Sequence, residues 1–98
     1  MSYYDYIRSD DFDNVFKELI NLQDVSVSMI QSRWKKSFYQ AKILYEEWCY
    51  YNDEVYIHNI LYELSFEDEP PTIARIMGRF RVSYRLAEKV FQIYMEDN

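Results

Sequence analysis

The chain has 98 residues, about half of them apolar, and a formal net charge of -6. A chain of roughly 100 residues can bury enough surface to fold as one small domain, so we expect a single compact domain over residues 1–98. The single cysteine, Cys49, excludes an internal disulfide, and no apolar stretch is long enough to cross a bilayer. These features predict a cytoplasmic protein that needs neither a membrane nor a cofactor.

The composition favours helices. The chain has only one Gly and two Pro beside eleven Tyr. Hairpin turns and phosphate-binding loops usually depend on glycine. We therefore expect an all-α fold with short connections.

Residues 1–10 have no clear periodicity, and they fit either a mobile arm or a short helix laid on the body. Apolar residues then recur at three- and four-residue spacing from Phe12 to Ile20, which predicts a helix capped by Asp10, Asp11 or Asp13. Further along, Ser26 or Ser28 precedes a short helix that ends near Trp34, and Ser37 precedes a longer helix that reaches Trp48.

The second part of the chain predicts three more helices. Asp53 can cap a helix that includes Ile57 to Leu64, although a short hairpin around residues 52–53, forming a reduced wing, is the alternative. Thr72 follows two prolines and can cap residues 73–80, and Ser83 can cap a last helix that reaches Tyr94. The prediction is six helices in two groups of three.

The two groups look like copies of one unit. Residues 33–44 match residues 79–90 at an offset of 46, with identical residues at Arg33/Arg79, Ser37/Ser83 and Ala41/Ala87. We expect two three-helix units, at 11–50 and 54–98, that share one core, because one such unit would bury too little alone. The spacing of four large aromatic residues predicts that they lie in this core: Phe38, Trp48, Tyr84 and Phe91.

Positive charge is concentrated in the repeated segments. Nine of the eleven Lys and Arg residues fall in two windows, 33–42 and 75–89, and sixteen of the seventeen acids lie outside them, with Glu88 the exception. Nucleic-acid affinity comes largely from cations that neutralise phosphates. The distribution of charge therefore indicates DNA more than the net charge does.

The second window, I-M-G-R-F-R-V-S-Y-R-L-A at 76–87, resembles the winged-helix gamma domain that ends DNA translocases of the FtsK and SpoIIIE kind. The first copy follows the same pattern more loosely at 30–41. The resemblance implies a tandem helix-turn-helix, winged-helix-like fold with reduced or absent wings. It also implies recognition helices at roughly 37–48 and 83–94 that enter the major groove of double-stranded DNA.

A helix-turn-helix usually meets phosphates with residues just before or at the start of its recognition helix. The candidates there are Arg33, Lys35, Lys36, Arg79 and Arg81. The candidates for the groove are Tyr39, Gln40, Arg85 and Lys89, of which Arg85 best suits a guanine edge. The alternative is that these cations are solvated charges that balance an acidic protein.

Catalysis has little support, because the lone His58 has no nucleophile or second His near it in sequence. We expect a small non-enzymatic DNA-binding or regulatory protein, monomeric or homodimeric, of the kind used in transcription regulation. The alternative is an acidic interaction protein, such as a phage or mobile-element inhibitor that mimics DNA and blocks a host protein. Clustering of six tyrosines with acids on one exposed face would favour the alternative: Tyr3, Tyr4, Tyr6, Tyr50, Tyr51 and Tyr56.

Overall fold

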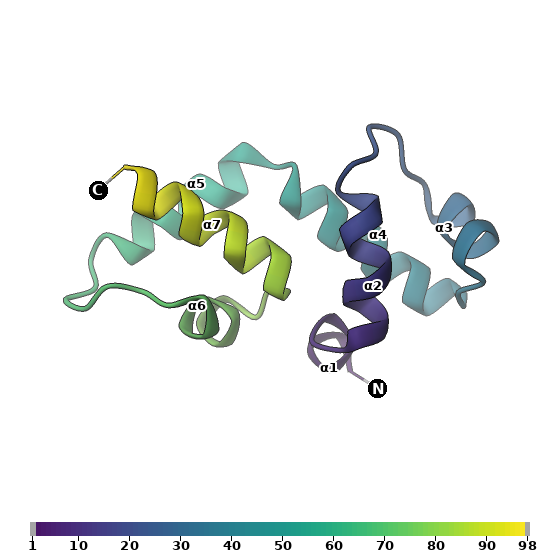
Figure 1. The fold of residues 1–98 in the computed structure, drawn as a ribbon, viewed down its shortest axis with the longest axis horizontal. Helices are drawn as coiled ribbons and strands as arrows, with labels where there is room; N and C mark the ends of the chain where they lie inside the picture. The colour runs from purple at the N-terminus through teal and green to yellow at the C-terminus, as the bar shows by residue number, and fades with distance from the viewer. Residues whose placement is uncertain (1, 98) are drawn as a thin grey trace.

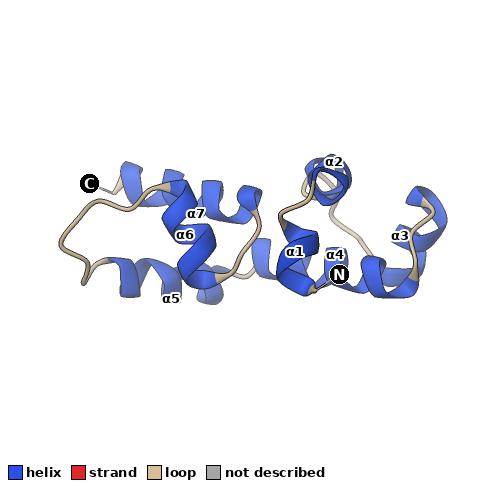
Figure 2. Cartoon of the chain, turned by 90° about the horizontal axis from the view of Figure 1, so that it is seen from below, coloured by secondary structure: helices blue, strands red, loops and turns tan. Residues whose placement is uncertain are grey.

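The computed structural model describes residues 2–97, and over that range the chain forms helices and connections without a strand (Figures 1 and 2). The prediction of an all-α fold is confirmed. The helices are α1 (Tyr3–Ile7), α2 (Asp10–Leu19), α3 (Val27–Trp34), α4 (Phe38–Tyr51), α5 (Glu54–Leu64), α6 (Ile73–Phe80) and α7 (Tyr84–Glu96).

Side-chain caps set where the helices begin. The predicted caps of α4, α5, α6 and α7 each accept a hydrogen bond from a backbone N–H two or three residues further on. The cap of α3 is Ser26 rather than Ser28. The cap of α2 is Ser9, one residue before the predicted aspartates, whose charges instead lie in the first turn of the helix. Asn52 and Asp53 form the turn between α4 and α5, so the alternative hairpin is not present there.

The N-terminal segment forms the short helix α1, which decides between the two alternatives for this part of the chain. Its residues Tyr6 and Ile7 are buried, and the ring of Tyr6 meets that of Phe12 edge to face at 5.6 Å. Ser2 caps this helix by accepting a hydrogen bond from the N–H of Asp5. Burial of these side chains, rather than any periodicity, holds the segment on the body.

The helices form two groups arranged along the long axis of a body measuring 44 × 27 × 17 Å. Figure 1 shows α1 to α4 at one end and α5 to α7 at the other, with α4 reaching the middle of the molecule. Within each group a short helix turns sharply into a longer one, α3 into α4 and α6 into α7. We call these turns the first corner (residues 27–42) and the second corner (residues 73–88).

The two corners have the same backbone. α3 ends at Lys35 and α6 ends at Arg81, and these residues have left-handed φ angles of 57° and 53°. The next amide in each corner donates to the carbonyl five residues back, at 3.3 Å in both cases. Ile30 and Ile76, which also stand 46 positions apart, are both fully buried beneath their corners.

The buried apolar residues form two clusters, one in each group of helices, instead of the single shared core expected from the sequence. The first cluster extends from Tyr6 to Leu44 and the second from Ile57 to Val90. Tyr51, at the end of α4, packs against both clusters. Each group is thus organised around its own longest helix, with contacts between α4 and α7 joining the two.

Two of the four aromatic residues expected in the core are exposed. Phe38 is 62% exposed and Tyr84 is 43% exposed, whereas Trp48 and Phe91 are partly buried. Each exposed residue is the first of its helix and lies more than about 90° around the axis from the middle of the buried face, at about 100° per residue. The buried residues of α4 are Ala41, Ile43, Leu44 and Glu47.

Candidate functional site

The second corner directs its cations toward other parts of the protein. Arg79 forms an ion pair with Glu67 and lies 3.9 Å from Glu63. The guanidinium of Arg81 lies over the ring of Tyr4, 4.3 Å from its centroid. Both residues therefore have partners within the molecule, although both remain exposed at its surface.

Two further cations of α7 face the group formed by α1 to α4. The Nε of Arg85 donates to Asp13 Oδ1 at 3.0 Å, and this hydrogen bond raises the pKa of Arg85. The Nζ of Lys89 donates to the carbonyl of Tyr51 and lies 4.2 Å from the centroid of its ring. Burial lowers the pKa of Lys89. The sequence suggested that both side chains point into a DNA groove, but the structure turns them toward α2 and α4.

Glu47 is the central residue of this contact between the two groups. Its side chain is 1% exposed, and its two oxygens accept from Tyr3 Oη at 2.6 Å and from the Ser83 amide at 3.1 Å. It therefore satisfies an amide at the start of α7 while holding α1 against α4. Burial raises the pKa of Glu47, and the two hydrogen bonds oppose that rise. We call the contact made by Glu47, Arg81, Arg85 and Lys89 the seam.

Glu47 is not among the site residues expected from the sequence. The residue beside it, Glu46, is also a glutamate on the same helix and is only half-buried. Both follow an apolar run in an acidic part of the chain. Glu46 lies three residues after the buried Ile43 and Glu47 three residues after the buried Leu44, so spacing does not mark one of them as buried.

The first corner differs from the second in what surrounds its cations. Arg33 is exposed and stacks on the ring of its neighbour Trp34 at 4.9 Å. Lys35 is exposed at the left-handed position. Lys36 is turned inward and pairs with Asp11 at 2.6 Å, and the hydrogen bond from Lys36 lowers the pKa of Asp11.

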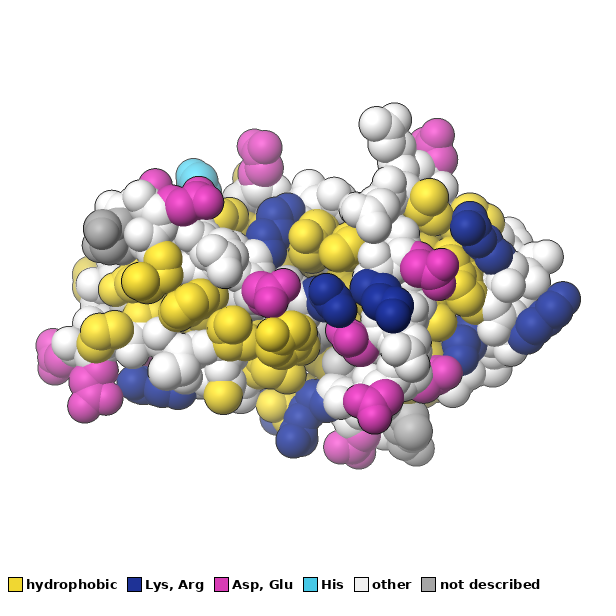
Figure 3. All heavy atoms as spheres, in the orientation of Figure 1, with side chains coloured by type: hydrophobic (Ala, Val, Ile, Leu, Met, Phe, Trp, Pro, Cys, Tyr) yellow, Lys and Arg dark blue, Asp and Glu magenta, His cyan; other side chains and the backbone are white. Residues whose placement is uncertain are grey.

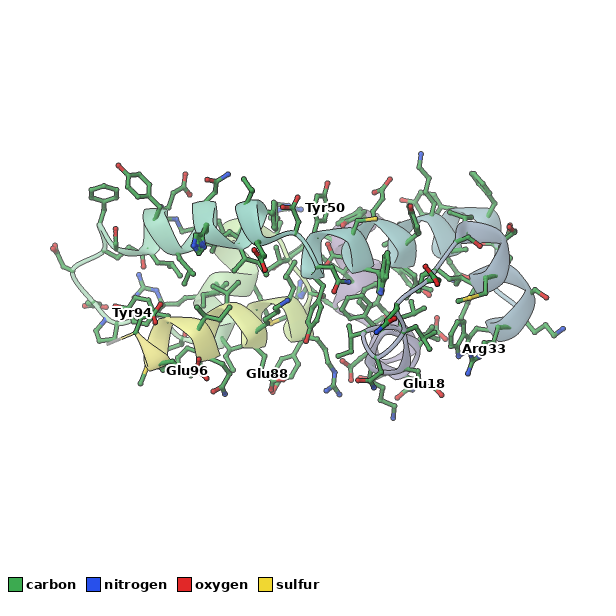
Figure 4. The ribbon with its side chains drawn as sticks, turned by 90° about the horizontal axis from the view of Figure 1, so that it is seen from above. Glu18, Arg33, Tyr50, Glu88, Tyr94 and Glu96 are labelled. Carbon is green, nitrogen blue, oxygen red and sulfur yellow. The ribbon has the colours of Figure 1, made fainter. Side chains whose placement is uncertain are left out.

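The first turn of α4 adds aromatic and polar groups beside these cations. Phe38 is 62% exposed and Tyr39 is 52% exposed, while Gln40 is partly buried. Lys42, one turn further on, is exposed. Arg33 lies at the far end of the molecule from the C-terminal part of α7, as its label in Figure 4 shows. We call the surface made by Arg33, Lys35, Phe38, Tyr39 and Lys42 the basic corner.

Figure 3 shows how charge is distributed on one face of the molecule. Lys and Arg side chains gather between the two groups of helices and again at the end that holds α3. Apolar side chains gather over the half that holds α6 and α7. The basic corner is thus separated along the long axis from the apolar half.

The six tyrosines whose clustering with acids would favour a DNA mimic do not form one exposed acidic face. Tyr6 is buried, and Tyr50, at 37%, is the most exposed of the six. The ring of Tyr50 stacks on that of Tyr56 at 4.6 Å. The other rings pack against the body, where burial raises the pKa of Tyr3, Tyr51 and Tyr56.

Among residues 2–97, no three side chains of the kinds that bind metals come together, and no helix is both long and apolar enough to span a membrane. Comparisons of the chain with protein-family models, with curated proteins and with solved structures found no match.

Proposed function

We propose that this is a small, non-enzymatic DNA-binding or regulatory protein whose first corner acts as a helix-turn-helix with α4 as its recognition helix. One observation carries the proposal. The turns of the two corners have the same backbone conformation, yet Arg33 lies only over the ring of its neighbour Trp34 and Lys35 forms no ion pair with a described residue. Their counterparts contact distant parts of the chain, because Arg79 pairs with Glu67 and Arg81 lies over the ring of Tyr4. Arg33 and Lys35, unlike Lys36 of the same corner, are therefore available to phosphates.

The chemistry of the basic corner suits a duplex. Arg33 and Lys35 precede α4, where the cations of a helix-turn-helix meet phosphates. The N-terminus of α4 adds backbone amides and a favourable dipole for a phosphate. Tyr39 and Lys42 then occupy exposed positions one turn apart, from which side chains can reach base edges.

The acidic charge of the remaining surface also favours an approach in which the basic corner faces the duplex. With a net charge of -6, most of the protein repels a polyanion. The basic corner is then the end that approaches the duplex. In this proposal the second unit keeps the helix-turn-helix shape as a structural support, with Arg79, Arg81, Arg85 and Lys89 holding it together.

The test is an anisotropy titration of the protein against mixed-sequence duplex DNA at several salt concentrations. We expect binding that weakens as salt rises, because cations bound to the duplex are released. Replacing both Arg33→Gln and Lys35→Gln should lower affinity by about tenfold or more and reduce the slope of log K against log salt by about 2.

The matched control is Arg79→Gln with Arg81→Gln, which removes the same charge at the equivalent positions of the second corner. We expect this variant to bind DNA like the unsubstituted protein, with circular dichroism verifying that each variant is folded. Equal losses in both variants would mean that net charge alone governs binding. Absence of salt-sensitive binding in the unsubstituted protein would remove the proposal.

A further inference from the structure

A second exposed surface lies on the outer side of α5, and it is independent of the basic corner. Val55, Tyr62 and Phe66 are 70%, 67% and 70% exposed, the highest values among the large apolar side chains of the described residues. Val55 and Tyr62 are seven residues apart, about two helical turns, and so share one face. The ring of Phe66 meets that of Tyr62 edge to face at 5.0 Å. We call these three residues the α5 stripe.

The buried face of α5 is a different one. Ile57, Ile60 and Leu64 are at most 4% exposed and pack into the second cluster. The α5 stripe therefore contributes nothing to that cluster, although apolar side chains at these spacings are what a helix presents to a packed neighbour. Figure 4 shows side chains that project from the outer side of α5, away from α7.

The acids around the α5 stripe outnumber the cations. No Lys or Arg occurs between residues 53 and 69. Arg75 and Arg79, from α6, pair with Glu67 and Glu69 beyond the end of α5, and Arg79 also lies 3.9 Å from Glu63 on α5. The remaining acids at the two ends of the α5 stripe form no ion pair with a described residue: Asp53, Glu54 and Asp68.

This charge pattern selects between two occupants. A second copy of the chain would place acids against acids, because carboxylates stand at the start of α5 and further carboxylates follow its C-terminal end. That arrangement is unfavourable whether the two helices run parallel or antiparallel. A partner with Lys or Arg beside an apolar face would gain both charge attraction and cation–π contact with the exposed rings.

We infer that the α5 stripe is a docking surface for a basic amphipathic helix of a partner protein. Apolar residues of that helix would cover Val55, Tyr62 and Phe66, and its Lys or Arg residues would lie against the acids at the two ends of α5. This is the helix-on-helix mode of recognition, in which anchors spaced three and four residues apart fill the contact.

The probe is a synthetic amphipathic helix of Leu and Lys, compared with the same peptide carrying Glu in place of Lys. Each is titrated into the isotope-labelled full chain, and backbone amide shifts are recorded. We expect the Lys peptide to shift amides within residues 53–68, and Tyr62→Ser with Phe66→Ser to weaken its binding by about tenfold or more. The Glu peptide should not bind.

The matched control is Phe38→Ser with Tyr39→Ser, which removes two exposed aromatic rings from the basic corner instead. This variant should bind the Lys peptide unchanged, whereas its DNA binding reports on the separate proposal for the first corner. Equal weakening in the two variants, or equal binding of the two peptides, would overturn the inference. So would sedimentation that shows a dimer of the unsubstituted chain, if the α5 variant dissociates it.

Discussion

Neighbouring residues of one type have different roles in this protein because their surroundings differ. Glu46 and Glu47 are adjacent on α4, yet only Glu47 is enclosed, with a tyrosine hydroxyl and a helix-capping amide as its partners. A buried carboxylate is costly unless hydrogen bonds compensate for its lost hydration. We therefore expect Glu47 to specify how α1 and α7 meet α4 more than it stabilises the folded state.

The pKa of Glu47 leads to a pH prediction. Burial raises this pKa in the folded chain above its ordinary value of 4.5. Well below pH 4.5 the carboxyl of Glu47 is protonated in both the folded and the unfolded chain, so it contributes nothing to the pH dependence of stability. As pH rises from 4.5 through the raised pKa, the unfolded chain loses its proton first, so the free energy of unfolding falls.

Glu47→Gln cannot ionise and should lack this fall. The free energy of unfolding of each protein is measured by urea titration. We expect the value for the unsubstituted protein minus the value for Glu47→Gln to decline as pH rises from 4.5 toward neutrality. Asp11, whose pKa is lowered, acts in the opposite direction but is present in both proteins. The exposed Glu96→Gln variant is the control. Parallel pH curves for the two proteins would show that Glu47 ionises as it would in water.

At the scale of elements, the paired corners were the most predictable part of the fold. Ser37 and Ser83 were predicted as caps from sequence, and both cap the expected helices. Capping depends on residues within one turn, so it can be read locally. The rotation of each helix about its axis is set by distant packing, which is why Phe38 and Tyr84 were wrongly placed in the core.

The left-handed residues of the corners give a matched pair of substitutions. Glycine adopts φ angles near 57° and 53° without the steric cost that other residues bear. Lys35→Gly should raise the free energy of unfolding by about 1 kcal/mol. Arg81→Gly should raise it by less, because the substitution also removes the contact with Tyr4.

Urea titrations of both glycine variants measure this difference between the corners. A smaller gain at Arg81 would assign part of the stability of the seam to its contact with Tyr4. Equal gains would mean that this contact contributes nothing measurable. Loss of stability in both would show that the left-handed conformation is not what limits these positions.

At the scale of the molecule, sequence could not show how the two groups of helices meet. The seam joins residues far apart in the chain, such as Asp13 with Arg85 and Glu47 with Ser83. Every acid in this chain is an equally good partner for Arg85 on composition alone. The same charge that suggested a guanine contact is used to hold α7 against α2. Because the cations of the second corner and of α7 have partners within the protein, the candidate DNA-binding site is the first corner.

The seam predicts that the two groups unfold together although their apolar clusters are separate. Leu19 and Leu64 are the last residues of α2 and α5, and both are at most 2% exposed. Replacing either with Ala should lower the free energy of unfolding by about 2 to 5 kcal/mol. Both tryptophans, Trp34 and Trp48, pack against the first cluster, so their fluorescence reports on α1 to α4 alone.

We expect Leu64→Ala to move the unfolding midpoints measured by tryptophan fluorescence and by circular dichroism equally, since one cooperative transition affects both signals. Leu19→Ala is the control, because it lies in the same cluster as the tryptophans. If Leu64→Ala leaves the fluorescence midpoint unchanged while the dichroism curve broadens, the two groups unfold independently.

The position of α1 has a practical consequence for handling the protein. Tyr3 and Tyr4 both contact the seam, so a fusion partner or affinity tag attached before them would lie next to that contact. Glu96 lies at the opposite end of the molecule from Arg33, as Figure 4 shows. An immobilisation handle placed after Glu96 would leave both the α1 packing and the basic corner open, and it is the better choice for surface-based assays of DNA binding.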